Sequence, residues 1–219
     1  MHNIVQNLVD IQNKINSHLD EHKIGKVPKI IAVSKTFKIE KILPLIDHGH
    51  KHFGENKVQE AVDKWTEIKL SNPNIQLHLI GKLQTNKVKF AVKIFDYIHS
   101  VDSEKLAKKI SDEQIKINKK IKIFIQVNIG QEDQKSGTSV NELSSLISYC
   151  NKINLDVVGL MCIPPINENP VSYFEKMKKL NEENKFNELS MGMSSDYLKA
   201  AMNNATYLRI GSSIFGQRY

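Results

Sequence analysis

The feature that most constrains this chain is a regular alternation between short apolar segments and longer segments with helical spacing. Short apolar runs bounded by turn-forming residues are typical of buried strands, and apolar residues three and four apart are typical of helices. Strands are expected at residues 30–34, 51–54, 75–80, 96–99, 121–128, 155–160, 188–191 and 206–210. Helices are expected near residues 39–47, 57–69, 85–94, 103–116, 139–151, 170–184 and 194–203, with a short run at 212–217. Such strand–helix units predict a parallel sheet.

One more amphipathic helix is expected before the first strand, over residues 2–22. Eight strand–helix units after this helix predict an α/β fold, a closed (β/α)8 TIM barrel with an extra N-terminal helix. An open doubly wound sheet is the alternative, but no G-x-G-x-x-G sequence follows any expected strand. Because no linker rich in Pro, Gly or Ser interrupts the pattern, residues 1–219 are predicted to form a single domain.

Composition excludes several classes of protein. The chain is 40% hydrophobic and 25% charged, which is ordinary for a soluble globular protein. No apolar run approaches the ~18 residues of a membrane helix, so no membrane partner is expected. Polar residues interrupt the apolar pattern of residues 1–25, which also lack arginine, so neither a signal peptide nor a transit peptide is predicted. The cytoplasm is the expected location.

The formal charge of +7 raises the possibility of nucleic-acid binding. The lysines are scattered, however, and the densest group, Lys116 to Lys122, has no interleaved aromatic residues for base stacking. A basic barrel that binds nucleic acid therefore remains a minor alternative, which salt-dependent binding would support. We do not expect nucleic acid to be a partner.

Lys35 directly follows the apolar run Ile30 to Val33 and Ser34. It is therefore expected at the carboxyl end of a buried parallel strand, where chemistry collects in barrel folds. A lysine that loses hydration there becomes a nucleophile for aldehydes. The alternative is a lysine at a strand end that reaches into solvent.

The ends of the last two strands have the small residues of a phosphate site. Gly192 and Ser194 follow one strand, with Ser194 or Ser195 as the expected helix N-cap, and Gly211 and Ser212 follow the other. Free N–H groups at such helix starts bind dianions, and barrels often place a phosphate there. Each loop alone could be a simple turn; together they predict a phosphate site.

Arg209 lies inside the last expected strand, and it is one of only two arginines among 31 basic residues. A buried charge is costly unless it is paired or has a function. The sequence therefore leaves two interpretations of Arg209, a ligand-binding residue or a member of a structural ion pair.

No metal site is predicted. His48, His50 and His52 alternate as ligands on a strand do, but Gly49 places them at the end of the barrel opposite the expected site. Cys150 and Cys162 are the only cysteines, and their spacing is not that of a metal site. Both are expected to be free thiols, Cys162 as a packed rather than a redox-sensing group.

Six ordered motifs resemble those of the pyridoxal phosphate homeostasis proteins, which are similar to the N-terminal barrel of alanine racemase. The motifs are AVSKT (32–36), FGEN (53–56), HLIGKLQTNK (78–87), GLM (159–161), LSMGMS (189–194) and RIGSSIFG (209–216). The resemblance covers nearly the whole chain. It implies pyridoxal 5′-phosphate as cofactor, with Lys35 forming the Schiff base and Ser194, Gly211 and Ser212 binding the phosphate.

The resemblance further implies that Arg209 faces the pyridine nitrogen and that Asn56 lies near the ring hydroxyl. Arginine opposite this nitrogen keeps it unprotonated, which weakens the ring as an electron sink. With no room for a second domain, a carrier or regulator of vitamin B6 supply without strong turnover is expected, rather than an enzyme in the usual sense. A weak amino-acid racemase is the alternative. Apo-enzymes that need the cofactor are the expected partners of a monomer, and Lys38 and Lys135 are candidates for relaying it.

Overall fold

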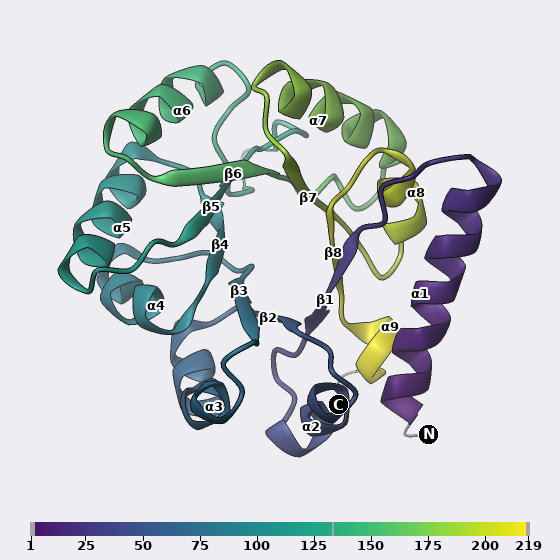
Figure 1. The fold of residues 1–219 in the computed structure, drawn as a ribbon. Coiled ribbons are helices and arrows are strands. Elements are labelled where there is room, and N and C mark those ends of the chain that lie inside the picture. Colours follow the sequence, from purple (N-terminus) through teal and green to yellow (C-terminus); the bar gives the residue numbers. More distant parts are fainter. Residues whose placement is uncertain (1–2, 133, 218–219) are drawn as a thin grey trace.

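A computed structural model describes residues 3–132 and 134–217, in which eight parallel strands close into a barrel in sequence order (Figure 1). The last strand pairs with the first, as Ile30 lies opposite Leu208 and Ile31 opposite Arg209. The strands are β1 (Lys29–Val33), β2 (His52–Glu55), β3 (Gln76–Leu79), β4 (Tyr97–Val101), β5 (Lys122–Gln126), β6 (Asp156–Met161), β7 (Glu188–Met193) and β8 (Tyr207–Ile210).

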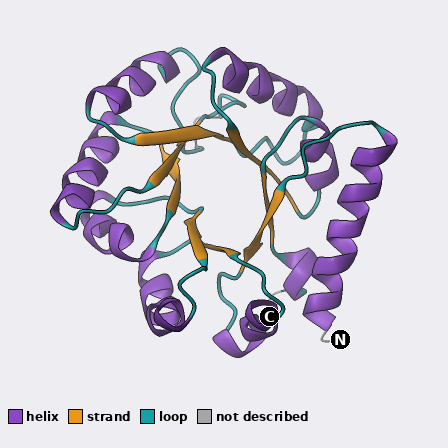
Figure 2. Cartoon of the chain, in the orientation of Figure 1, coloured by secondary structure: helices purple, strands orange, loops and turns teal. Residues whose placement is uncertain are grey.

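Helices surround the strands as an outer ring (Figure 2). They are α1 (Asn3–Glu21), α2 (Ile39–Asp47), α3 (Val58–Ser71), η1 (Thr85–Lys87), α4 (Val88–Ile94), α5 (Glu104–Lys116), α6 (Leu143–Lys152), α7 (Val171–Glu183), α8 (Tyr197–Met202) and α9 (Ser212–Phe215). The extra helix α1 packs on α8 and α9 with its buried stripe, which includes Ile4, Leu8 and Ile15. No helix in the described part of the chain is both long and apolar enough to span a membrane.

The predicted TIM barrel and its N-terminal helix are confirmed, since each expected strand and helix has a counterpart. Two helix starts differ. The helix α6 begins at Leu143 rather than 139, because Thr138 pairs with Val127 and extends the loop. The helix α8 begins at Tyr197 with Asp196 at the N-cap position, so the expected N-cap at Ser194 or Ser195 was wrong.

Two sets of buried side chains fill the structure. The larger one lies between the strands and the helices, where Trp65 and Phe174 are fully buried. The smaller one fills the barrel and consists of Ile31, Tyr97, Phe124, Met161 and Tyr207. The barrel is therefore a packed core, and any ligand site has to lie at one of its ends.

Gly159 allows β6 to approach β7 closely. A Cβ atom at this position would stand 1.8 Å from the backbone oxygen of Glu188, a contact that only a backbone shift relieves. We expect Gly159→Ala to lower the free energy of unfolding by about 3 kcal/mol, as severe overpacking does. Gly25→Ala is the control, because nothing lies within 4 Å of its added Cβ. Equal urea midpoints for the two variants would contradict this prediction.

Candidate functional site

A cavity of about 310 Å³ lies at the carboxyl ends of the strands. All six residues singled out from the sequence line it, and they come from the ends of four strands. They are Lys35, Asn56, Ser194, Arg209, Gly211 and Ser212. The remaining lining residues include four apolar side chains that the sequence analysis missed, Val33, Ile80, Ile163 and Met193. Each of these residues lies at or close to the carboxyl end of a strand. That position in the sequence is the signal that could have identified them.

The buried carboxylate of Glu55 supports the strand end before Lys35. The side chain of Lys35 is partly buried. The Ser34 hydroxyl donates to Glu55 Oε1 at 2.7 Å, and Trp65 Nε1 donates to the same oxygen at 3.0 Å. Lys64 Nζ donates to Glu55 Oε1 and to the Ser34 carbonyl, each at 3.0 Å. Burial raises the pKa of Glu55, against the opposing effects of Trp65 and Lys64. The strand end before Lys35 is therefore held by several bonds.

The next residue, Thr36, has a backbone φ of 69°, in the left-handed region that β-branched residues rarely adopt. Its N–H donates to Glu60 Oε1, which also accepts from Lys64 Nζ at 2.9 Å. This conformation costs on the order of 1–3 kcal/mol, which the surrounding bonds have to offset. The chain therefore turns sharply just after Lys35, and the lysine stays at the cavity.

The loops after β7 and β8 meet at the other side of the cavity. Ser194 Oγ accepts hydrogen bonds from the backbone N–H groups of Gly211, at 3.3 Å, and Ser213, at 3.4 Å. Gly192 has a φ of 88°, and a Cβ there would stand 2.4 Å from that of Ala200. The two loops thus form one small-residue surface of hydroxyl and N–H groups, which is suited to an anion.

Arg209 is 5% exposed and lines the cavity floor. Its Nη1 donates to Ser190 Oγ at 2.7 Å, and its Nη2 donates to the carbonyl of Cys162 at 2.8 Å. Burial lowers the pKa of the Arg209 guanidinium. None of the ion pairs found between described residues includes Arg209, so nothing there supports the structural ion pair considered from the sequence. The sequence analysis missed Ser190, because nothing marks which face of a strand a lone serine occupies.

The two lysines considered as relays lie at different places. Lys38 is exposed at the start of α2, beside a shallow groove that Phe37 and Lys57 also line. Lys135 forms an ion pair with Glu132 and donates to the Pro164 carbonyl at 3.1 Å. It lines a second depression of about 300 Å³, which shares three wall residues with the first cavity: Asn56, Ile80 and Ile163.

Burial raises the pKa of the Cys162 thiol to about 12, which agrees with a packed thiol. His50 and His52 lie at the start of β2, away from the cavity. Among described residues, one group has the geometry to offer three metal ligands, His18, Glu21 and His22 on α1. The sequence analysis did not single out this group.

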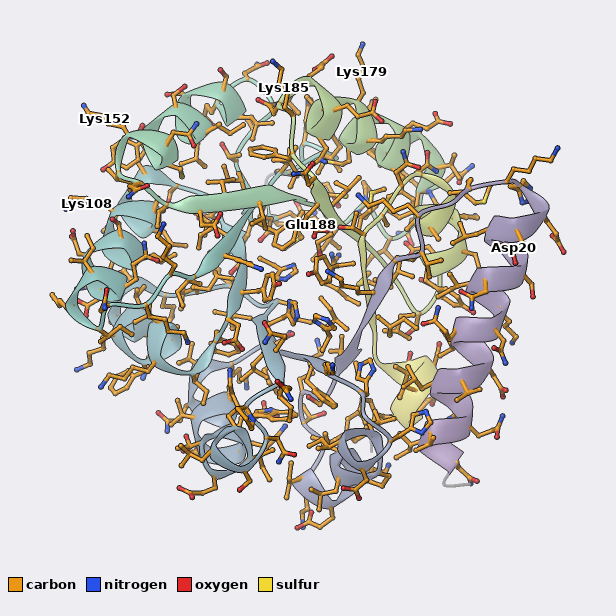
Figure 3. All side chains as sticks on the ribbon, viewed as in Figure 1. Asp20, Lys108, Lys152, Lys179, Lys185 and Glu188 are labelled. Carbon is orange, nitrogen blue, oxygen red and sulfur yellow. The ribbon has the colours of Figure 1, made fainter. Side chains whose placement is uncertain are left out.

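Charged side chains extend from different helices of the ring (Figure 3). The labelled lysines Lys108, Lys152, Lys179 and Lys185 extend outward from the helical layer, whereas Glu188 lies on the inner side of the ring (Figure 3). Glu188 Oε1 is 3.9 Å from Lys29 Nζ at the amino-terminal end of the barrel. This spread agrees with the scattered lysines of the sequence.

Comparison with known proteins shows which family has this sequence and this cavity-bearing barrel. The family model described as "Alanine racemase, N-terminal domain" matches residues 6–219. The pyridoxal phosphate homeostasis protein of Vibrio alginolyticus is 37% identical, over 100% of this chain and 99% of its own. That of Aquifex aeolicus is 39% identical over 87% of each chain.

A solved structure extends the comparison. PipY of Synechococcus elongatus PCC7942, whose structure has PLP bound, is 32% identical and has a TM-score of 0.80, covering 92% of this chain and 100% of PipY. The similarity spans nearly the full length of each of these proteins. From its sequence and its barrel alike, this chain belongs to the pyridoxal phosphate homeostasis protein family, within the alanine racemase N-terminal domain family.

Proposed function

We propose that this protein binds pyridoxal 5′-phosphate in the 310 Å³ cavity, through a Schiff base with Lys35. The observation that supports this most is the convergence of an amine, a guanidinium and a small-residue anion surface on one cavity. PipY, solved with PLP bound, supports the same ligand class. When bound, the cofactor supplies an aldehyde carbon that exchanges between amines and a ring that accepts electrons.

Different residues of the cavity would bind different parts of the cofactor. Ser194, Gly211 and Ser212 hold the phosphate with hydroxyl and N–H groups at the start of α9. Arg209 would face the pyridine nitrogen and, as a permanent cation, would oppose protonation of that atom. Asn56 would contact the ring hydroxyl. The apolar wall formed by Ile80, Ile163 and other residues excludes water from the ring.

The biological role that fits these residues is homeostasis of vitamin B6, as a carrier or regulator rather than a strong catalyst. An unprotonated ring nitrogen makes a weak electron sink, so binding and release fit better than turnover. We further propose that residues 1–219 act as a single-domain monomer in the cytoplasm and that PLP-dependent apo-enzymes receive the cofactor. A weak amino-acid racemase is the second candidate, and loss of optical activity from single amino-acid enantiomers would favour it.

The test of cofactor binding is an absorption spectrum of the purified protein with PLP, before and after borohydride reduction, followed by peptide mapping. We expect a visible band that reduction abolishes, with the added mass on the peptide that contains Lys35. No band after PLP is added would contradict the proposal and make another phosphorylated ligand the candidate for the cavity.

Transfer of the cofactor tests Lys38 and Lys135. If either amine relays the cofactor, its replacement by alanine will slow PLP transfer to an apo-enzyme about threefold or more. The reason is that a nearby amine has a high effective concentration, and without it the cofactor has to reach the apo-enzyme through solution. Lys179→Ala, on the outer surface of α7, is the control (Figure 3). Transfer rates equal to that of the control would exclude both lysines as relays.

A further inference from the structure

Three histidines on neighbouring strands form a hydrogen-bonded chain inside the barrel. His52 Nδ1 on β2 lies 3.0 Å from His78 Nε2 on β3, and His78 Nδ1 lies 2.9 Å from His99 Nε2 on β4. His99 Nδ1 lies 2.9 Å from Ser190 Oγ on β7. Ser190 in turn accepts a hydrogen bond from Arg209. This series of hydrogen bonds therefore crosses the barrel from the start of β2 to the cavity floor.

The direction of the hydrogen bonds follows from Arg209, which has no acceptor atom. Its N–H occupies one lone pair of Ser190 Oγ, and His99 Nδ1 is the other partner found for this oxygen among the described residues, so we assign the hydroxyl proton of Ser190 to His99 Nδ1. The proton of His99 is then on Nε2 and donates to His78 Nδ1. The same rule places the proton of His78 on Nε2, where it donates to His52 Nδ1. All three rings are therefore neutral Nε2–H tautomers.

Ring packing fixes the two inner histidines, whose exposed fractions are both 0%. The ring of His78 stacks on Tyr97 with centroids 4.3 Å apart. The ring of His99 stacks on Phe124 with centroids 4.2 Å apart. Neither ring can rotate without displacing an aromatic neighbour, so the acceptor offered to Ser190 has a fixed position.

We propose that His99 is a positioning residue that fixes the guanidinium plane of Arg209 through Ser190, and that His78 and His52 fix the tautomer of His99. The guanidinium is held by two neutral acceptors, Ser190 Oγ and the Cys162 carbonyl, in place of a carboxylate. No carboxylate of a described residue pairs directly with it, although Asp196 lies near enough to oppose the lowering of its pKa by burial, and its direction is set by the two neutral acceptors. Only the use of this arrangement, to face a pyridine nitrogen, depends on the proposed function.

The chain contains two arginines, which makes the test clean. Protein labelled with ¹⁵N-arginine gives two guanidinium signals in NMR spectra, one from Arg209 and one from Arg218, which lies outside the described residues. We expect separate Nη signals for Arg209 in the apoprotein, because bonds at both Nη atoms slow its rotation. In protein labelled with ¹⁵N-histidine, we expect the Nε2–H pattern for His99. Averaged Nη signals, or an Nδ1–H tautomer at His99, would overturn the proposal.

Variants separate hydrogen bonding from packing. We expect His99→Leu, which removes the acceptor that holds the Ser190 hydroxyl, to speed rotation of the Arg209 guanidinium about fivefold, the value of one neutral hydrogen bond. His99→Asn should restore slow rotation, because its amide oxygen replaces Nδ1 as the acceptor. His48→Leu, at an exposed histidine after α2 that lies outside the hydrogen-bonded series, is the control and should leave rotation unchanged.

Two results would overturn the proposal: rotation in His99→Leu as slow as in the wild type, or equally fast rotation in His99→Asn and His99→Leu. If His99→Leu does not fold, Ser190→Ala tests the same link, and unchanged rotation there is equally decisive. With PLP added, the dissociation constant should rise about fivefold in His99→Leu and stay unchanged in the control. A wild type that binds no PLP refutes the proposed function, while the NMR signals still decide the role of His99.

Discussion

Replacing Lys35 with alanine will abolish the visible band and the borohydride-trapped adduct. The amine of Lys35 is the only lysine nitrogen among the described residues that line the main cavity, so no other amine there can form the covalent bond. Noncovalent contacts to the phosphate and the ring remain, and we expect PLP to bind at least about 100-fold more weakly, a loss of roughly 3 kcal/mol. Equilibrium dialysis and absorption spectra measure both effects.

Two further variants make the result specific. Lys57→Ala removes an exposed lysine that follows Asn56 at the same end of the barrel, and it should retain the full band. Lys35→Arg keeps the positive charge but cannot form the Schiff base, so it should lose the band as Lys35→Ala does. A reducible adduct that persists in Lys35→Ala would show that another amine carries the cofactor.

Acid will destabilise the protein between pH 6.5 and pH 4. Burial lowers the pKa of His50 and of His52 from 6.5 to about 4, and it places those of His78 and His99 well below 6.5. In this pH window the unfolded chain binds protons that the folded protein does not, so stability falls as the pH falls. His50 and His52 each account for about 3 kcal/mol by pH 4.

Nearby charges set the size of this effect. Lys29, Lys51 and Lys122 lower the pKa of His52 further, whereas the raised pKa of Glu55 acts in the opposite direction. Four histidines acting together give a slope of roughly 5 kcal/mol per pH unit, a large part of the stability of an ordinary domain. Urea unfolding at pH 8, 7, 6 and 5 measures the slope directly.

A single substitution checks the origin of the slope. His50→Gln removes one titrating ring at the barrel end and should reduce the slope by roughly 1.4 kcal/mol per pH unit. A free energy of unfolding that stays constant from pH 8 to pH 5 would show that these histidines are protonated in the folded protein.

The architecture was predictable because each strand is a short apolar run and each helix has a clear stripe. Lys35, Gly211 and Ser212 were predictable as neighbours because the carboxyl ends of parallel strands share one end of a barrel. The start of α8 was not, because Asp196 accepts a hydrogen bond from the Met193 N–H at 2.6 Å, a choice among neighbouring polar residues that only local geometry settles.

The histidine chain could not be predicted for a different reason. His99 and Ser190 are 91 residues apart, and their contact depends on which strand residues point into the barrel. A register change of one residue would turn His78 or His99 outward and leave the chain broken. Pattern analysis places these histidines on strands, but only the barrel's register brings their rings into contact.

The pairing of β1 with β8 has a consequence for protein synthesis. Lys35 is translated long before Gly211 and Ser212, and the cavity needs residues from both β1 and β8. A nascent chain that has not completed its final strand therefore has the nucleophile without the anion surface. Ligand capture of this kind waits until the barrel closes, so a bound cofactor would report that all eight strands have been made and folded.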